Sequence, residues 1–318
     1  MNKLKKIRVG ITMGDPAGIG SEIILKALKM PKVLGLAKFV VIGDRKVFQK
    51  VGGLPDKNIE FIDLNNVGKK NFCFGKINAI NGKASLEYIF EALNLWRRKQ
   101  IDCLVTCPLS KEAIELAGFH YKGHTELLAD LCHSKEPLML LMNKYLKFSL
   151  VTRHIAIKKV PSTLNKEQVY KTLLSTQAAL KDFFKINRPR LVVLALNPHA
   201  SDGGLFGREE IEIIQPAVNE VKTEVIIEGP LAADSAIQKL RQGKYDCAVA
   251  MYHDQALIPL KLTDAGSGVN LTYGLPFVRT SPLHGTAFDI AGKNKASPNS
   301  LIAAIKLAIR CTQNQRSA

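Results

Sequence analysis

Residues 7–28, IRVGITMGDPAGIGSEIILKAL, combine an apolar run, a glycine-rich turn and an amphipathic stretch. The β-branched residues of Ile7–Met13 are typical of a strand, and Gly14–Gly18 has the glycines and proline of a tight turn. Ser21–Leu28 then places apolar residues at helical spacing. A strand, a turn and a helix in this order form the repeating unit of an α/β fold, so the stretch predicts that fold class.

The glycine-rich turn allows two interpretations. It is similar to the turn that binds the phosphates of a dinucleotide, but Gly14, Gly18 and Gly20 do not have the GxGxxG spacing. Asp44 is the nearest candidate for the acidic residue expected about 20 residues further on. The other interpretation is a tight turn that simply begins a helix, and the residues leave both open.

The same strand–turn–helix pattern recurs along the chain, which predicts mostly parallel sheets with helices on both faces. The further predicted strands are Phe39–Ile42, Cys103–Thr106, Leu191–Leu196, Val225–Ile227 and Cys247–Met251. The further predicted helices are Lys83–Arg98, a helix from Ser110, a helix from Asn165 to about Phe184, Arg208–Asn219, Ala232–Gln242 and Ser300–Cys311. Leu138–Asn143 and Leu146–Thr152 fit an antiparallel pair, so one sheet is expected to be mixed.

Length and composition fit an ordinary globular protein of about two domains. The formal net charge is +17, which could serve nucleic-acid binding. However, the lysines are scattered in pairs such as Lys5-Lys6, Lys69-Lys70 and Lys158-Lys159, without a basic stripe interleaved with aromatic residues. The six cysteines form no CxxC pair, and the basic N-terminus lacks a signal peptide's apolar region, so a cytoplasmic protein is expected.

Three histidines follow three predicted strands at the strands' carboxyl ends, where α/β proteins bind ligands. They are His154, His199 and His253, with Asp202 and Asp254 close by in sequence. A single histidine in such a place is usually a solvated or capping side chain. Three in equivalent positions favour a catalytic site for a divalent metal, in which an aspartate orients an imidazole or adds a ligand.

Two further regions carry candidate ligand-binding groups. Thr106–Lys111 and Gly123-His124-Thr125-Glu126 each open a helix, whose free N–H groups either bind an anion or are simply capped. The segment Lys261–Gly292 is dense in polar residues, including Lys261, Asn270, Arg279, His284 and Asp289. It is either a surface loop with hairpins or a functional loop whose Arg279 grips a carboxylate or phosphate.

Several motifs together resemble the 4-hydroxythreonine-4-phosphate dehydrogenase family of vitamin B6 biosynthesis. They run in order between about residues 7 and 311: Gly14–Gly20, Gly123–Glu126, Asn197-Pro198-His199-Ala200, Met251–Gln255 and Gly274–Ser281. The stretch His284–Gly292 is also similar to the adenine-side loop of isocitrate and isopropylmalate dehydrogenases. The resemblance implies two α/β/α domains of that type, 1–125 with 285–318 and 126–284, and an active site in the cleft between them.

The resemblance also implies residue roles. His154, His199 and His253 would ligate one divalent ion (zinc, magnesium or cobalt), with one of the three histidines coming from the partner in a homodimer. His124, Thr125, Lys261, Asn270 and Arg279 would bind the substrate, and His284, Gly285, Thr286 and Asp289 would contact NAD or NADP. Lys261 and Asp254 are the candidates for the catalytic base, beside a water relay.

The implied reaction is the oxidation of 4-phosphooxy-L-threonine and its decarboxylation to 3-amino-2-oxopropyl phosphate. One alternative is the same chemistry on D-threonate or D-erythronate 4-phosphate, because these motifs do not distinguish such substrates. The alternative of a different class is a non-catalytic nucleic-acid-binding protein, favoured only by the charge. No membrane partner is expected, because no apolar run reaches the roughly 20 residues of a membrane helix.

Overall fold

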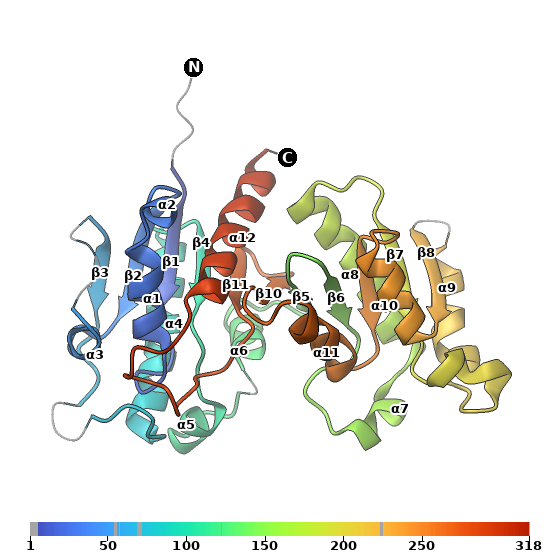
Figure 1. Cartoon of the computed structure of the whole chain (residues 1–318), viewed down its shortest axis with the longest axis horizontal. Coiled ribbons are helices and arrows are strands. Elements are labelled where there is room, and N and C mark those ends of the chain that lie inside the picture. Colours follow the sequence, from blue (N-terminus) through green and yellow to red (C-terminus); the bar gives the residue numbers. More distant parts are fainter. Residues whose placement is uncertain are drawn as a thin grey trace. The chain divides into compact units, whose positions relative to one another are not determined.

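The computed structural model describes residues 6–53, 56, 58–68, 72–121, 123–222 and 225–317. The described chain forms two compact units. The first comprises the residues up to Pro137 together with Val269–Ser317, and the second comprises Leu138–Gly268 (Figure 1). The chain thus passes between the units at residues 137/138 and 268/269, whereas the sequence placed these points at 125/126 and 284/285.

The sheet of the first unit has the strand order β3-β2-β1-β4-β11-β10. All neighbouring strands are parallel except β10 and β11, which are antiparallel. The central strands are buried almost throughout, as expected for a parallel sheet covered on both faces. The bounds are β1 (Arg8–Thr12), β2 (Lys38–Gly43), β3 (Glu60–Asp63), β4 (Cys103–Thr106), β10 (Val269–Tyr273) and β11 (Val278–Pro282).

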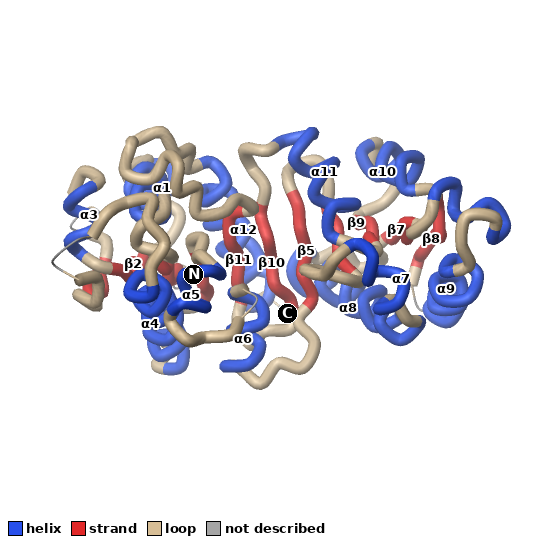
Figure 2. The backbone as a smooth tube through the Cα atoms, turned by 90° about the horizontal axis from the view of Figure 1, so that it is seen from below, coloured by secondary structure: helices blue, strands red, loops and turns tan. Residues whose placement is uncertain are grey.

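Helices lie on both sides of this sheet, with α1 on one side and α4 on the other (Figure 2). α4 contacts β1 and β2, whereas α12 contacts β4 and β11. The bounds are α1 (Gly20–Leu28), α2 (Pro31–Leu34), α3 (Arg45–Lys50), α4 (Ala79–Arg97), α5 (Lys111–Leu116), α6 (His124–Leu131) and α12 (Asn299–Arg316). The predicted strand–turn–helix unit at residues 7–28 is therefore confirmed.

The sheet of the second unit has the strand order β5-β6-β9-β7-β8. β5 and β6 form the predicted antiparallel pair, with Leu140 opposite Ser149, and the remaining neighbours are parallel. The prediction of a mixed sheet is confirmed. The bounds are β5 (Leu138–Met142), β6 (Lys147–Leu150), β7 (Arg190–Leu194), β8 (Ile226–Leu231) and β9 (Cys247–Ala250).

The helices of the second unit include the predicted long one, α8, which begins where the sequence placed its cap. The Asn165 side chain accepts a hydrogen bond from the Gln168 N–H at 2.9 Å. The predicted helix Arg208–Asn219 is a π-helical turn at Glu210–Ile214 followed by α9. The bounds are α7 (Val160–Thr163), α8 (Lys166–Phe184), α9 (Gln215–Val221), α10 (Ala233–Arg241) and α11 (His253–Asp264), with 3₁₀ turns at Ile157–Lys159 and Pro198–Gly204.

The segment Lys261–Gly292 contains a hairpin, as one interpretation expected, but it is not a surface loop. It contains the end of α11 and the antiparallel pair β10 and β11, and all five residues of β11 are buried. β11 lies between β4 and β10, so it is an interior strand of its sheet. Within the described ranges, no helix is both long and apolar enough to cross a membrane.

Candidate functional site

The glycine-rich turn follows β1 and packs tightly against the loop that follows β4. Gly14 has φ +74°, and a Cβ there would lie 2.2 Å from the Pro108 carbonyl oxygen. The Asp15 N–H donates to that oxygen at 2.9 Å, and Asp15 Oδ1 accepts from the Ala17 N–H at 2.9 Å. At Gly20 a Cβ would lie 1.9 Å from the Met13 carbonyl oxygen. These glycines are therefore required for close backbone packing, whichever ligand the turn serves.

The turn also contacts the predicted nucleotide loop. The Ile19 N–H donates to the Thr286 carbonyl at 3.0 Å, and a Cβ on Gly18 would lie 3.1 Å from that same oxygen. His284 Nδ1 lies 2.9 Å from the Gly285 carbonyl oxygen, while His284 Nε2 is buried without a hydrogen-bond partner. Burial lowers the pKa of His284, so the ring is neutral at neutral pH.

Two more buried polar atoms without partners lie on this turn or directly before it, Thr12 Oγ1 and Asp15 Oδ2. Burial raises the pKa of Asp15 from its ordinary value of 3.8 to about 6. Buried polar atoms normally have hydrogen-bond partners, and exceptions often mark places where a ligand binds. The turn and the loop at His284–Thr286 thus offer unused donors and acceptors at the carboxyl end of β1.

Arg279 is buried in the first unit, with 1% of its surface exposed. Its Nε and Nη2 donate to Thr106 Oγ1 at 3.2 and 2.6 Å, and Nη1 donates to Thr272 Oγ1 at 3.2 Å. The two hydroxyls come from the strands on either side, because β11 lies between β4 and β10. A guanidinium has five N–H groups, so two remain for a ligand.

Arg279 forms no ion pair with any described residue, which is costly for a buried charge. Burial lowers the pKa of Arg279 to about 9, and the nearby carboxylate of Glu126 opposes that change. The side chain therefore still carries its charge at neutral pH. A buried arginine with free donors and no carboxylate partner is suited to bind an anion.

α6 begins beside this arginine and carries two of the predicted substrate residues, His124 and Thr125. Burial, and then the charge of Arg279, hold the pKa of His124 well below its usual value. His124 Nε2 and Glu126 Oε2 are buried without hydrogen-bond partners, as is Asn270 Oδ1 on β10. The free N–H groups of the first turn add further donors. His124, Glu126 and Asn270 thus each carry a buried polar atom that lacks the partner a polar ligand would supply.

In the second unit, two of the three predicted metal ligands lie together. The ring centroids of His154 and His253 are 5.6 Å apart. His253 is the first residue of α11, and its Nδ1 lies 2.7 Å from Asp254 Oδ1. An aspartate in this position fixes the ring and leaves Nε2 for another partner, the arrangement common around metal-bound histidines.

His199 lies in an unusual left-handed turn after β7. Four consecutive residues that are not glycine have positive φ, between 45° and 66°, from His199 to Asp202. Its ring centroid is 6.4 Å from that of Phe206. Among the described residues of this single chain, no three His, Cys, Asp or Glu side chains are placed to hold a metal ion. One chain therefore supplies a histidine pair rather than a complete set.

The histidine loops are held in place by two residues outside the predicted site, Glu210 and Gln255. Glu210 is buried and accepts hydrogen bonds from the N–H groups of Leu196 and Asn197, both at 2.8 Å. Gln255 accepts from the Met251 N–H at 2.8 Å and donates to the Ala195 carbonyl at 2.7 Å, joining the loops after β7 and β9. The only sequence signal was the position of Gln255, two residues after His253.

Lys261 and Asp254, the candidate bases, are both exposed on α11. The last residue of the predicted nucleotide set, Asp289, provides only its carbonyl oxygen to an observed hydrogen bond, from Lys293 Nζ at 2.8 Å. The structure thus groups the predicted residues by unit. His124, Thr125, Asn270, Arg279 and the residues from His284 to Asp289 belong to the first unit, whereas His154, His199, His253, Asp254 and Lys261 belong to the second.

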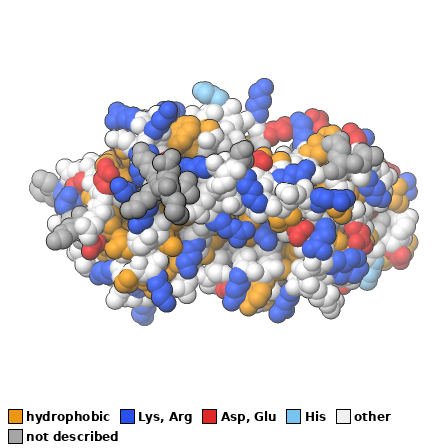
Figure 3. All heavy atoms as spheres, turned by 90° about the horizontal axis from the view of Figure 1, so that it is seen from above, with side chains coloured by type: hydrophobic (Ala, Val, Ile, Leu, Met, Phe, Trp, Pro, Cys, Tyr) orange, Lys and Arg blue, Asp and Glu red, His pale blue; other side chains and the backbone are white. Residues whose placement is uncertain are grey.

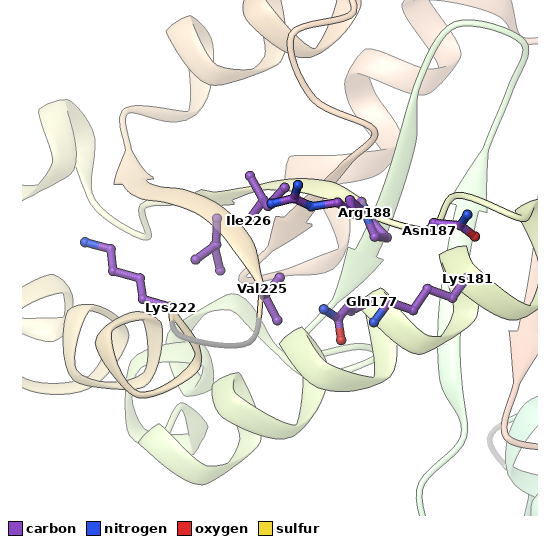
Figure 4. A pocket seen from close by; sticks show the side chains of 9 residues that line it. Gln177, Lys181, Asn187, Arg188, Lys222, Val225 and Ile226 are labelled. Atoms are coloured by element: carbon purple, nitrogen blue, oxygen red, sulfur yellow. The ribbon is translucent and has the colours of Figure 1, made fainter.

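A cavity of about 520 Å³ in the second unit contains none of the predicted site residues. Lys181 and Arg188 line it together with Gln177 and Ile226 (Figure 4). Elsewhere the basic side chains are spread widely, as the face in Figure 3 shows. Of the lysine pairs noted in the sequence, Lys158-Lys159 forms a 3₁₀ turn, whereas Lys5, Lys69 and Lys70 lie outside the described residues.

The described units are α/β units with mostly parallel strands, a buried arginine that has spare N–H groups, and a pair of neighbouring histidines. The chain belongs to the PdxA family: residues 32–308 match the family described as "Pyridoxal phosphate biosynthetic protein PdxA". The resemblance noted from the motifs is thereby confirmed.

Named relatives cover nearly the whole chain. A 4-hydroxythreonine-4-phosphate dehydrogenase of Sulfurihydrogenibium sp. (strain YO3AOP1) is 44% identical over 95% of this chain and 98% of its own. A "Putative D-threonate 4-phosphate dehydrogenase" of Fusobacterium nucleatum is 36% identical over 97% of this chain and 98% of its own.

Solved structures have the same fold as this chain. The crystal structure of 4-hydroxythreonine-4-phosphate dehydrogenase from Klebsiella pneumoniae has a TM-score of 0.86, with 37% identity over 98% of this chain and 100% of its own. Isocitrate dehydrogenase from Methylococcus capsulatus shares the fold alone. It has 14% identity and a TM-score of 0.52, over 98% of this chain and 88% of its own. The predicted fold class is confirmed.

Proposed function

We propose that the protein oxidises 4-phosphooxy-L-threonine with NAD or NADP, in a reaction that needs a divalent metal, and that the oxidised product loses carbon dioxide to give 3-amino-2-oxopropyl phosphate. The observation that carries the proposal is Arg279, a buried charge with free N–H groups and no carboxylate partner. Such a group is complementary to the phosphate or carboxylate of this substrate.

The first unit binds and orients the anionic substrate in this proposal. Arg279 presents its two unused N–H groups, and Thr106 and Thr272 fix the plane of the guanidinium. Neutral His124 can donate to or accept from a substrate oxygen through Nε2, and Thr125 and Asn270 add polar contacts. Fixing both ends of a short substrate selects one orientation of its reacting hydroxyl.

The histidines of the second unit fit a divalent metal. His154 and His253 lie close together, and Asp254 leaves Nε2 of His253 available. His199 is the proposed third ligand, and the resemblance implies that one of the three comes from a partner subunit. When bound, a zinc, magnesium or cobalt ion supplies Lewis-acid polarisation of the reacting hydroxyl and of the ketone formed from it. Lys261, Asp254 or a water relay is proposed to accept the hydroxyl proton.

The nucleotide is proposed to bind along the glycine-rich turn and the loop His284–Asp289. His284 Nε2 and Asp15 Oδ2 are buried without partners there, and the loop contacts the turn through Thr286. These atoms fit the hydrogen-bonding edges of a base or an amide. When bound, NAD or NADP accepts the hydride, and the sequence of the turn does not favour one of the two.

The partner is proposed to be a second copy of this chain. The segments that follow the three histidines expose large apolar side chains: Ile157 is 72% exposed, Leu205 74% and Leu262 83%. Exposed apolar side chains mark a protein interface when they form one contiguous patch, which is what the proposal requires of these three. Burying them in a homodimer would also bring histidines from two chains within reach of one ion.

The proposed location is the cytoplasm. All six cysteines of the chain are free, as is usual in a reducing compartment.

A substrate panel tests the reaction. We expect NADH formation to be fastest with 4-phosphooxy-L-threonine and to be lost with unphosphorylated 4-hydroxy-L-threonine. The relative named for D-threonate 4-phosphate makes D-threonate and D-erythronate 4-phosphate the second candidates. A higher kcat/KM with either of these would replace the proposed substrate but keep the chemistry, whereas neither NADH nor NADPH from any of the three phosphates would overturn the proposal.

A further inference from the structure

α5 brings a lysine toward the start of α6, where Arg279 and His124 lie. Lys111 is the first residue of α5, and Ser110 before it caps the helix by accepting from the Ala113 N–H at 3.1 Å. α5 follows β4 by a loop of four residues, so the strand that supplies Thr106 to Arg279 also positions Lys111. The backbone direction at Lys111 is thereby fixed by a strand end and a helix cap.

The lysine side chain reaches Gly123, the residue that begins α6. A Cβ placed on Gly123 would lie 4.0 Å from Lys111 Cε and 3.4 Å from Glu126 Oε2. The exposed Lys111 side chain therefore extends toward the first turn of α6, and its ammonium group forms neither an ion pair nor a hydrogen bond with any residue that the structure describes. Glu126 Oε2 is likewise buried without a hydrogen-bond partner.

The charges around the start of α6 do not balance. Lys111 and Glu126 both approach Gly123, and Glu126 also acts on the buried Arg279, so two cations lie around one carboxylate, while His124 is neutral. The free N–H groups of the α6 first turn add positive potential. A dianion would use the unpaired ammonium and the two spare guanidinium N–H groups.

We propose that Lys111 is a further substrate-binding residue, which contacts the phosphate of the substrate together with Arg279 and the first turn of α6. This rests on the proposed function for the identity of the substrate, but the anion site itself does not. The ligand chemistry is a phosphate monoester dianion, and inorganic phosphate is the simplest probe of it.

The kinetic test compares Lys111→Gln with Lys32→Gln, which removes the same charge from an exposed lysine of α2. We expect Lys111→Gln to raise the KM for the phosphorylated substrate about ten- to hundredfold, as for a lost hydrogen bond to a charged group. The kcat and the KM for NAD should change little, and Lys111→Arg should recover most of the loss. Lys32→Gln should behave as wild type, because Lys32 can act on the substrate only through the net charge of the protein.

A binding test separates this inference from the proposed function. Inorganic phosphate should raise the Tm of the wild type and of Lys32→Gln, and should raise that of Lys111→Gln much less. If Lys111→Gln matches Lys32→Gln in both KM and phosphate stabilisation, the proposed role of Lys111 is wrong, even though the enzyme is active. If the wild type turns over no phosphorylated acid but its phosphate stabilisation depends on Lys111, the reaction is wrong and the anion site stands.

Discussion

Arg279 shows how a single residue can point to a ligand. Two threonine hydroxyls accept its hydrogen bonds, and neither neutralises its charge. Removing a guanidinium from water without a paired anion costs several kcal/mol, so a fold gains nothing in stability from it. Its retention in the interior is explained when a bound anion completes the pair.

Replacing Arg279 by alanine should therefore affect substrate more than cofactor. Loss of a buried, charge-assisted contact costs about 3 kcal/mol, which should raise the KM for the phosphorylated substrate roughly a hundredfold. Steady-state kinetics with each substrate varied in turn would measure this. An equal rise in the KM for NAD would place Arg279 at the nucleotide instead.

The raised pKa of Asp15 predicts that the stability of the protein depends on pH. Its pKa rises from 3.8 to about 6 on folding, so the folded protein binds the proton more tightly than the unfolded chain. The stability that this group contributes is present below pH 4 and is lost as the pH rises to about 6. Asp15→Asn, which cannot ionise, should therefore gain stability over wild type between pH 4 and 7, by up to about 3 kcal/mol.

Urea unfolding of the two proteins without cofactor at several pH values provides the measurement. A difference in unfolding free energy that stays constant from pH 4 to 7 would show that Asp15 is not buried as described.

At the scale of elements, the glycine-rich turn is fixed by backbone packing. Gly20 leaves no room for a Cβ beside the Met13 carbonyl, whereas a Cβ on Gly285 would meet no atom within 4 Å. Gly20→Ala should destabilise the protein by at least about 2 kcal/mol, and Gly285→Ala by less than about 1. Chemical denaturation would compare them, and equal effects would contradict the packing described for the turn.

The sequence predicted the elements whose own residues decide their conformation. β1, β4 and β9 are apolar runs bounded by turns, and Asn165 marks the start of α8 with its own side chain. A hairpin was one expectation for the segment that contains β11, but its burial was missed because Val278–Pro282 is mostly polar and ends in proline. Strands pair with it on both sides and α12 covers it, which local pattern does not reveal.

The residues of the candidate site were chosen from the sequence, whereas the backbone conformation around them could not be. The left-handed turn at His199–Asp202 has no glycine in the four residues concerned, and such residues disfavour that conformation. Glu210 holds the preceding backbone from a position more than ten residues later. A long-range contact of this kind cannot be recognised from local sequence, and neither can the neutral state of His124, which depends on burial beside Arg279.

At the scale of the whole molecule, the proposed metal site draws on a second copy of the chain. The histidine segments expose Ile157, Leu205 and Leu262, and a single chain brings no three ligands together within its described part. The net charge of +17 is spread over many separate side chains, which favours attraction of anionic substrates over a defined nucleic-acid surface.

Leu262→Glu should weaken the proposed homodimer, because it would place a charge in the proposed apolar interface. We expect the dimer dissociation constant to rise at least about thirtyfold, which corresponds to about 2 kcal/mol. Light scattering over a dilution series would measure it. Leu36→Glu, at an exposed leucine of the first unit, is the matched control, and a wild type that is monomeric at all concentrations would contradict the shared site.

The ratio of NADH to carbon dioxide tests the proposed metal-dependent oxidative decarboxylation most directly. With 4-phosphooxy-L-threonine, the protein should form NADH and carbon dioxide in equal amounts, stop when a chelator removes the metal, and recover when a divalent ion is restored. His199→Ala should remain folded and fail to recover. Full activity of His199→Ala in a stringently metal-free assay, or NADH formed without carbon dioxide, would contradict the account.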